Sequence, residues 1–208
     1  LLTLRLEAFD DGLRINGSSL YMAAGARADA GVTAKGAVAV DQQRLLDILT
    51  KLPQSKTVTC SLTEEGKFRL KSGSSRYDIA MMSADDFPKQ PKPSSEALLE
   101  LPSTLLTEMI DATYMAMLQD DQRAHLSGIL FTWDEKQAAM TATDGMRLNR
   151  IVKKFSAKSS GKVFVPFRAV LTIRKFCESL EQVQDVSIAT SGSYLHVWIK
   201  TAGFACKL

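Results

Sequence analysis

Apolar and polar residues change their spacing twice along this chain of 208 residues, at two equivalent places. Valine alternates with other residues in 36–40 and again in 161–165, which is the spacing of a β-strand with one buried face. In both cases the apolar residues that follow are three or four positions apart, as in an amphipathic helix. Asp41 stands directly before the first of these helices, where its carboxylate can cap the N-terminus. The pattern predicts two copies of a strand that leads into a helix.

The similarity between the two regions extends further at the same offset of 125 residues, which is the distance from 36 to 161. Leu4 and Leu6 correspond to Ile129 and Phe131 at this offset. Each unit is predicted to run strand, turn, strand, strand, helix, and then three further strands in antiparallel succession. The chain is therefore interpreted as a tandem repeat.

A proline-rich segment separates the two units. Pro88, Pro91 and Pro93 lie within six residues, which excludes the interior of a helix and the centre of a sheet. Such a segment is typical of a connector. We therefore predict two domains, 1–95 and 96–208.

The second unit opens with a strand and a helix that have no counterpart in the first. The helix is predicted to begin at Ser103 as its N-cap and to carry apolar residues along one face. The corresponding segment of the first unit would lie before residue 1. We therefore expect the first domain to lack its first strand and helix.

The charge balance is close to neutral. The net charge is +3, and lysine and arginine are divided evenly between the two predicted domains. A protein that holds nucleic acid mainly by electrostatic attraction carries a stronger basic bias. Any contact with nucleic acid is therefore expected to be local and weak.

Cysteine and histidine are too few for most metal or catalytic sites. Cys60, Cys177 and Cys206 are widely spaced and form no CxxC motif, which favours reduced thiols in a cytosolic protein. His125 and His196 are the two histidines, so few residues are available for a His-centred metal site or for the histidine of a Ser-His-Asp triad. The sequence also has no GxxxxGK[ST] phosphate-binding motif, and no apolar run approaches the roughly 20 residues that span a bilayer.

Four segments, taken in their order and spacing, resemble one protein family. They are 86–88 (DFP), 123–131 (RAHLSGILF), 142–148 (ATDGMRL) and 163–166 (VFVP). Together they resemble motifs of the first two domains of the bacterial DNA polymerase III β subunits, the DNA sliding clamps. The resemblance covers the whole chain, and a third clamp domain is absent from it.

The resemblance implies an α+β fold of repeated DNA-clamp domains, with antiparallel sheets outside and helices lining the inner face of a ring. It implies a non-catalytic processivity factor that encircles double-stranded DNA without sequence preference. The implied partners are the replicative DNA polymerase, the clamp loader and other clamp-motif proteins. A homodimer in the full-length protein, a cytoplasmic location, no membrane contact, no cofactor and no metal are implied as well.

The segment 143–145 between two predicted strands is, by its residues alone, a hairpin turn. In the resembled family the same segment forms half of a hydrophobic pocket for short peptides that contain Gln and Leu or Phe. Most relatives have His where this chain has Met146, which removes a polar group from the implied pocket. Carried over by position, the protein-binding residues are Leu126, Thr143, Gly145, Met146, Arg147 and Leu148.

Basic residues on the two repeated helices are candidates for DNA contact. Arg44 and Lys51 are seven residues apart, as are Arg168 and Lys175, so each pair is predicted to share one helix face. By themselves such residues indicate a solvated surface, whereas the resemblance implies that Arg168 faces DNA. Gln43 stands where relatives often have Arg, so contact in the first unit is expected to shift to Arg44. The implied DNA-binding residues are Arg168, Lys175, Arg44, Lys51, Gln119 and His125.

Two further functions remain compatible with the residues. A peptide-binding module that never closes a ring would use the same pocket, and it would lack a third unit after Leu208. A small hydrolase would rely on Asp144 and His125, and its activity would be lost when Asp144 is replaced.

Overall fold

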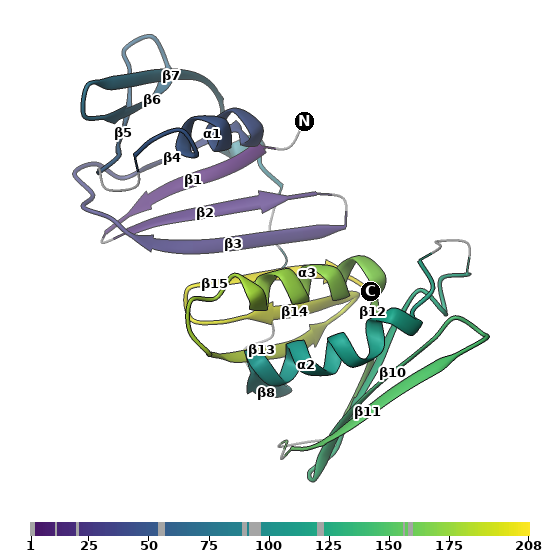
Figure 1. Cartoon of the computed structure of the whole chain (residues 1–208). Coiled ribbons are helices and arrows are strands. Elements are labelled where there is room, and N and C mark those ends of the chain that lie inside the picture. Colours follow the sequence, from purple (N-terminus) through teal and green to yellow (C-terminus); the bar gives the residue numbers. More distant parts are fainter. Residues whose placement is uncertain are drawn as a thin grey trace. The chain divides into compact units, whose positions relative to one another are not determined.

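The computed structural model describes residues 3–10, 12–19, 21–53, 57–88, 91, 97–119, 123–155, 157 and 160–208. The chain divides into two compact units, Leu1–Gln90 and Pro91–Leu208 (Figure 1). The domain boundary that the sequence predicted between 95 and 96, and with it Pro93 of the connector, lies outside the described residues.

The first unit is an antiparallel sheet with one α-helix packed on it. Its elements are β1 (Thr3–Phe9), β2 (Gly12–Ser18), β3 (Met22–Asp29), β4 (Gly36–Asp41), α1 (Gln42–Leu49), β5 (Thr59–Leu62), β6 (Lys67–Ser72), β7 (Ser75–Met82) and the 3₁₀ turn η1 (Ala84–Asp86). The strand order is β5-β6-β7-β4-β1-β2-β3. Alternate strand residues and one residue of the helix form the buried core: Leu6, Val38, Val40, Leu45, Phe68, Leu70 and Ile79.

The ends of α1 are set by short polar contacts. Asp41 accepts a hydrogen bond from the backbone N–H of Arg44 at 2.8 Å, which confirms the predicted N-cap. At the other end, Oγ1 of Thr50 donates to the carbonyl oxygen of Leu46 at 2.8 Å, and the helix stops at Leu49. Lys51 therefore lies in the turn beyond the helix, and the prediction that it shares a helix face with Arg44 is wrong.

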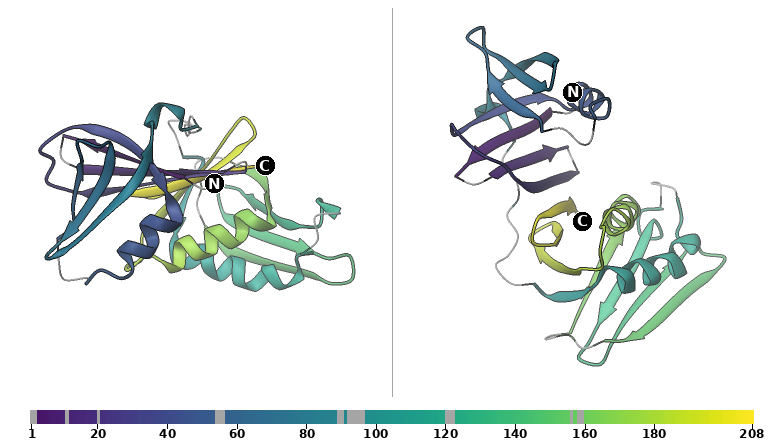
Figure 2. Two further views of the ribbon diagram at one scale, coloured as in Figure 1. Left: turned by 90° about the horizontal axis from the view of Figure 1, so that it is seen from above. Right: turned by 60° about the vertical axis from the view of Figure 1, so that its left-hand side comes forward.

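The second unit has two antiparallel sheets and two α-helices. Its elements are β8 (Leu99–Pro102), α2 (Ser103–Thr113), the 3₁₀ turn η2 (Tyr114–Ala116), β9 (Gly128–Trp133), β10 (Gln137–Thr143), β11 (Leu148–Lys154), β12 (Gly161–Pro166), α3 (Phe167–Glu178), β13 (Asp185–Ser191), β14 (Tyr194–Trp198) and β15 (Ala202–Lys207). One sheet has the order β15-β14-β13-β8 and the other has the order β11-β10-β9-β12. The helices lie side by side against the second sheet (Figure 2).

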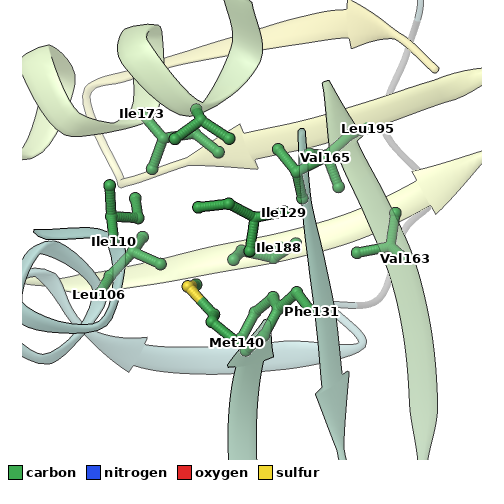
Figure 3. A pocket seen from close by; sticks show the side chains of 11 residues that line it. Leu106, Ile110, Ile129, Phe131, Met140, Val163, Val165, Ile173, Ile188 and Leu195 are labelled. Carbon is green, nitrogen blue, oxygen red and sulfur yellow. The ribbon is translucent and has the colours of Figure 1, made fainter. Parts of the chain in front are cut away.

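The core of the second unit is formed where both sheets meet both helices (Figure 3). A void of about 10 Å³ at its centre has an entirely apolar lining, so no side chain there could hold a water molecule. The lining combines α2, α3 and strands of both sheets: Leu106, Ile110, Ile129, Phe131, Met140, Val163, Val165, Val170, Ile173, Ile188 and Leu195.

The structure confirms the predicted repeat, but four strands precede each repeated helix, and the prediction of three was wrong. β3-β2-β1-β4 followed by α1 has the same strand order and direction as β11-β10-β9-β12 followed by α3. The segments 36–52 and 161–179 thus share one topology. Within the described residues of the first unit, β8 and α2 have no counterpart.

The start of α2 differs from the prediction. Pro102 occupies the N-cap position and Ser103 is the first helical residue. The strand β8 continues to Pro102, which pairs with Asp185, so the backbone is still extended there. Ser103 is held instead by Gln184, whose carbonyl oxygen accepts from its backbone N–H at 2.8 Å.

His196 is a buried base in the middle of β14. It pairs with Ala189 of β13 and Ala205 of β15, and the residue is 3% exposed. Among the residues that the structure describes, its Nε2 finds no hydrogen-bond partner. Burial lowers the pKa of His196 below the ordinary value of 6.5, because the imidazolium form loses its hydration.

We expect acid to destabilise the second unit through His196. A histidine whose folded pKa is below its unfolded pKa takes up a proton on unfolding. Its contribution to stability is therefore complete above about pH 6.5 and is lost as the pH falls through the lowered folded pKa. Between about pH 7.5 and about pH 5, the melting temperature should fall further for the native protein than for His196→Gln, which does not titrate there. Parallel melting curves for the two proteins would contradict this expectation.

Candidate functional site

The turn between β10 and β11 is held in shape by its own side chains. Oγ1 of Thr143 donates to the carbonyl oxygen of Arg147 at 2.7 Å and accepts from the backbone N–H of Gly145 at 3.1 Å. Oδ1 of Asp144 accepts from the backbone N–H groups of Met146 and Arg147, each at 3.0 Å. Gly145 has a φ of +92°, a conformation that side-chain-bearing residues rarely adopt. The turn therefore has a fixed backbone, which lowers the entropic cost of binding a ligand beside it.

Asp144 also fixes the side chain of Arg147. Nε of Arg147 donates to Oδ2 of Asp144 at 3.0 Å. The backbone N–H of Arg147, followed by that of Met146, holds the pKa of the Asp144 carboxyl below its ordinary value of 3.8. A carboxylate with a lowered pKa that already accepts three hydrogen bonds is a poor general base. This disfavours the hydrolase that would pair Asp144 with His125.

Folding brings Leu126 to this turn from a separate segment. Its backbone N–H donates to the carbonyl oxygen of Arg123 at 2.9 Å, and its own carbonyl oxygen accepts from the N–H of Leu118 at 3.1 Å. Its side chain then reaches the turn, because a Cβ added to Gly145 would lie 3.9 Å from Cδ1 of Leu126. Leu126 and Gly145 are thus neighbours although 18 residues, which include β9 and β10, lie between them in the sequence.

The apolar side chains at the turn differ in exposure. Leu126 is half-buried, Leu148 is 62% exposed and Met146 is 97% exposed. Leu148 pairs with Thr143 at the start of β11, so it stands directly beside the turn. An exposed leucine next to a half-buried one offers apolar area that a partner side chain can cover. Met146 instead extends into solvent, and Leu148 is not a core residue.

Two of the six candidate DNA-contact residues lie on α3. Arg168 and Lys175 are both exposed, and their separation of seven residues places them on the same side of the helix. Arg44 is exposed on α1.

The other candidates lie outside helices. Lys51 is in the turn after α1, and Gln119 and His125 belong to the segment between η2 and β9. All three are exposed. The structure therefore gathers only Arg168 and Lys175 on one helix face.

Arg174, which the sequence pattern did not single out, links α3 to α2. Its Nε donates to Oδ1 of Asp111 at 2.6 Å, and a second guanidinium nitrogen lies 3.1 Å from Oε1 of Glu178. Its guanidinium also lies over the ring of Tyr114, 5.6 Å from the centroid. Two carboxylates already neutralise this charge, so Arg174 holds the helices together and is not a further DNA-contact candidate. Its only sequence signal was the four-residue spacing to Glu178.

In the described part of the chain, no three His, Cys, Asp or Glu side chains gather in a way that could hold a metal ion. No helix there is long and apolar enough to cross a membrane. Cys60, Cys177 and Cys206 carry free thiols, and burial raises the pKa of Cys177 and of Cys206 to about 11. Both buried thiols are therefore protonated and unreactive at neutral pH.

Comparison with known families accounts for both units. The sequence model of the DNA polymerase III beta subunit, N-terminal domain, matches residues 1–91, and that of the central domain matches residues 100–208. The chain belongs to the DNA polymerase III beta subunit family. The resemblance seen in the sequence and the predicted α+β clamp fold are confirmed.

Individual relatives agree with this assignment. The beta sliding clamp of Salmonella typhimurium is 29% identical over 196 residues, which are 93% of this chain and 53% of that protein. The beta sliding clamp of Vibrio cholerae is 32% identical over 157 residues, which are 75% of this chain and 43% of that protein. A crystal structure of the sliding clamp from Pseudomonas aeruginosa bound to griselimycin has a TM-score of 0.87 at 25% identity, covering 99% of this chain and 56% of that one. The chain spans about half the length of the curated relatives it matches.

Proposed function

We propose that this chain supplies two consecutive domains, 1–95 and 96–208, of a DNA sliding clamp. In the full-length protein the clamp acts as a homodimer that encircles double-stranded DNA in the cytoplasm. It is the non-catalytic processivity factor of a replicative DNA polymerase. The observation that carries the proposal is the match of two clamp-domain families, in the order N-terminal then central, to residues 1–91 and 100–208.

The turn and Leu126 form one half of the site through which the clamp tethers its partners. The polymerase, the clamp loader and other proteins each insert a short peptide with Gln and Leu or Phe. The fixed backbone at Gly145 allows the peptide main chain to approach closely, and Leu126 and Leu148 supply apolar area. The proposed pocket residues are Leu126, Thr143, Gly145, Met146, Arg147 and Leu148.

DNA contacts are made mainly by α3. The exposed Arg168 and Lys175 lie on one helix face and reach phosphate oxygens, which carry no sequence information. Weak, salt-sensitive contacts of this kind allow a ring to slide. The remaining proposed contacts are Arg44, Lys51, Gln119 and His125.

Retention on circular DNA tests the ring. We expect the full-length protein, once loaded on a nicked circular plasmid, to stay bound through gel filtration at about 0.15 M salt, because the ring holds DNA topologically while each contact is screened. Cutting the plasmid once should release the protein. A peptide-binding module that never closes a ring would give the same weak retention before and after the cut, and that outcome would overturn the sliding-clamp proposal.

A further inference from the structure

The sheet β11-β10-β9-β12 has one face turned away from the helices. Nδ2 of Asn149 donates to the carbonyl oxygen of Ala112 at 3.2 Å, and Nζ of Lys153 lies 2.5 Å from Oε1 of Glu108. Both partners belong to α2, so the alternate residues of β11 point to the opposite side. On the other three strands, the residues that face the helices lie in the core (Figure 3), and the residues that alternate with them point to the outward face. The helix-facing residues are Ile129, Phe131, Met140, Val163 and Val165.

Two adjacent rows of side chains, each mixing apolar with polar residues, cross the outward face. The row nearer the β10–β11 turn consists of the successive cross-strand partners Phe164, Leu130, Thr141 and Arg150. The next row consists of Lys162, Thr132, Ala139 and Val152. Leu130 is 40% exposed and Val152 is 44% exposed, so the apolar area is not shielded by the chain itself. We call this region the outer sheet surface, made of Leu130, Val152, Phe164, Arg150, Lys154 and Lys162.

The outer sheet surface is positively charged. Arg150, Lys154 and Lys162 are exposed, and none of them forms an ion pair with another described residue. The outward positions of the four strands carry no Asp or Glu. Three acids lie in the turns that join these strands: Asp134 and Asp144 are bound there by backbone N–H groups, and Glu135 is exposed in the β9–β10 turn without an ion pair to a described residue. The three positive charges are therefore available to a partner.

The surface is continuous with the proposed peptide pocket. Gly128 stands between Leu126 and Leu130 in the chain, and the ring of Phe164 lies over it, because a Cβ added to Gly128 would come within 2.6 Å of Cζ of Phe164. On β11, Arg150 follows Leu148 on the same face. A peptide that leaves the pocket therefore meets Phe164 and Leu130 on the β9 side and Arg150 on the β11 side.

We propose that the outer sheet surface binds the segment next to the pocket motif in a partner protein, and that this segment combines apolar with acidic side chains. The inference rests on the proposed peptide pocket. Exposed Leu130 and Val152 and half-buried Phe164 gain by being covered with apolar groups, which phosphates of DNA do not supply. The unpaired basic groups gain from carboxylates placed between those apolar groups. A segment of this composition satisfies both demands and fixes which partners bind most tightly.

Peptides of three kinds test this proposal on the full-length protein. One carries only the pocket motif, and the others add a segment with two leucines and three glutamates on its N-terminal or C-terminal side. We expect one extended peptide to bind about tenfold more tightly than the motif alone at low salt, with the advantage shrinking as salt screens the charges. Lys162→Glu and Arg150→Glu should each weaken that extended peptide by about three- to tenfold and leave the motif peptide unchanged. Lys200→Glu, an exposed lysine between β14 and β15, is the charge-matched control and should change neither.

The outcomes separate this surface from the pocket. Equal binding of all peptides, unaffected by Lys162→Glu and Arg150→Glu, would overturn the outer-surface proposal and leave the pocket intact. Lys162→Glu could instead leave the peptide affinities unchanged and weaken the binding of duplex DNA, or change the oligomeric state. Either result would assign the surface to DNA or to a second copy and would overturn the outer-surface proposal. If the motif peptide does not bind the native protein, the proposal of a peptide pocket is overturned. The acidic segment tested alone then decides: binding that Lys162→Glu removes supports the surface, and no binding refutes it.

Discussion

Replacing Leu148 with lysine should weaken the binding of a peptide that contains Gln and Leu or Phe to the full-length protein by more than tenfold while the protein stays folded. Leu148 is 62% exposed, so its lysine replacement remains solvated and the melting temperature should not change. In the complex, however, the charge would lie where an apolar anchor of the peptide docks. Truncating or replacing such anchors typically costs about 2 kcal/mol or more. Peptide titration and thermal melting of the same variant measure the two effects.

Val183→Lys is the matched control for this experiment. Val183 is 63% exposed, close to the value for Leu148, but it lies in the turn before β13 and not at the β10–β11 turn. We expect Val183→Lys to bind the peptide as the native protein does. A folded Leu148→Lys variant with native affinity would remove Leu148 from the site, and an unfolded one would assign it to the core.

Gly128→Ala should destabilise the second unit by about 2–4 kcal/mol. An added Cβ would overlap the carbonyl oxygen of Val165 and would lie 2.6 Å from Cζ of Phe164. Gly128 pairs with Pro166 where β9 meets β12, so the backbone cannot move aside without breaking the strand pairing. The free energy of unfolding, measured with a chemical denaturant, should show the loss.

Gly36→Ala provides the comparison, because a Cβ added at Gly36 meets no atom within 4 Å. Its free energy of unfolding should stay within about 0.5 kcal/mol of the native value. Equal stability of Gly128→Ala and Gly36→Ala would contradict this prediction, because it would show that β9 and β12 can move apart at Gly128 without loss of stability. Because Phe164 covers Gly128, a displaced ring in Gly128→Ala should also lower the affinity for the extended peptide.

The repeat could be predicted because it depends on local patterns. Alternating valines define β4 and β12, and the switch to helical spacing follows each of them directly. Asp41 was visible as a cap because the capping contact spans only three residues, to Arg44. The family motifs carried the rest, since strand order within each unit cannot be read from spacing alone.

The features that the sequence did not reveal depend on contacts between distant segments. Ser103 is not the cap of α2, because pairing with β13 keeps the chain extended up to Pro102. The site residue Leu126 meets Gly145 only after two strands have paired. Arg174 finds Asp111 on another helix, 63 residues away. Tertiary packing decides each of these, and it overrides or adds to the local preference.

The two units also show which positions of a repeated strand packing constrains. Leu6 and Phe131 occupy the same inward position of β1 and β9, and both are buried. One residue earlier, the outward position holds Arg5 in one copy and Leu130 in the other. Arg5 forms an ion pair with Glu7 at 2.8 Å, whereas Leu130 is exposed and apolar. The core requires a large apolar residue at this position in both copies, whereas the outward position can be charged or apolar. The outward residues of this strand can therefore differ between the copies while the inward residue stays apolar and buried.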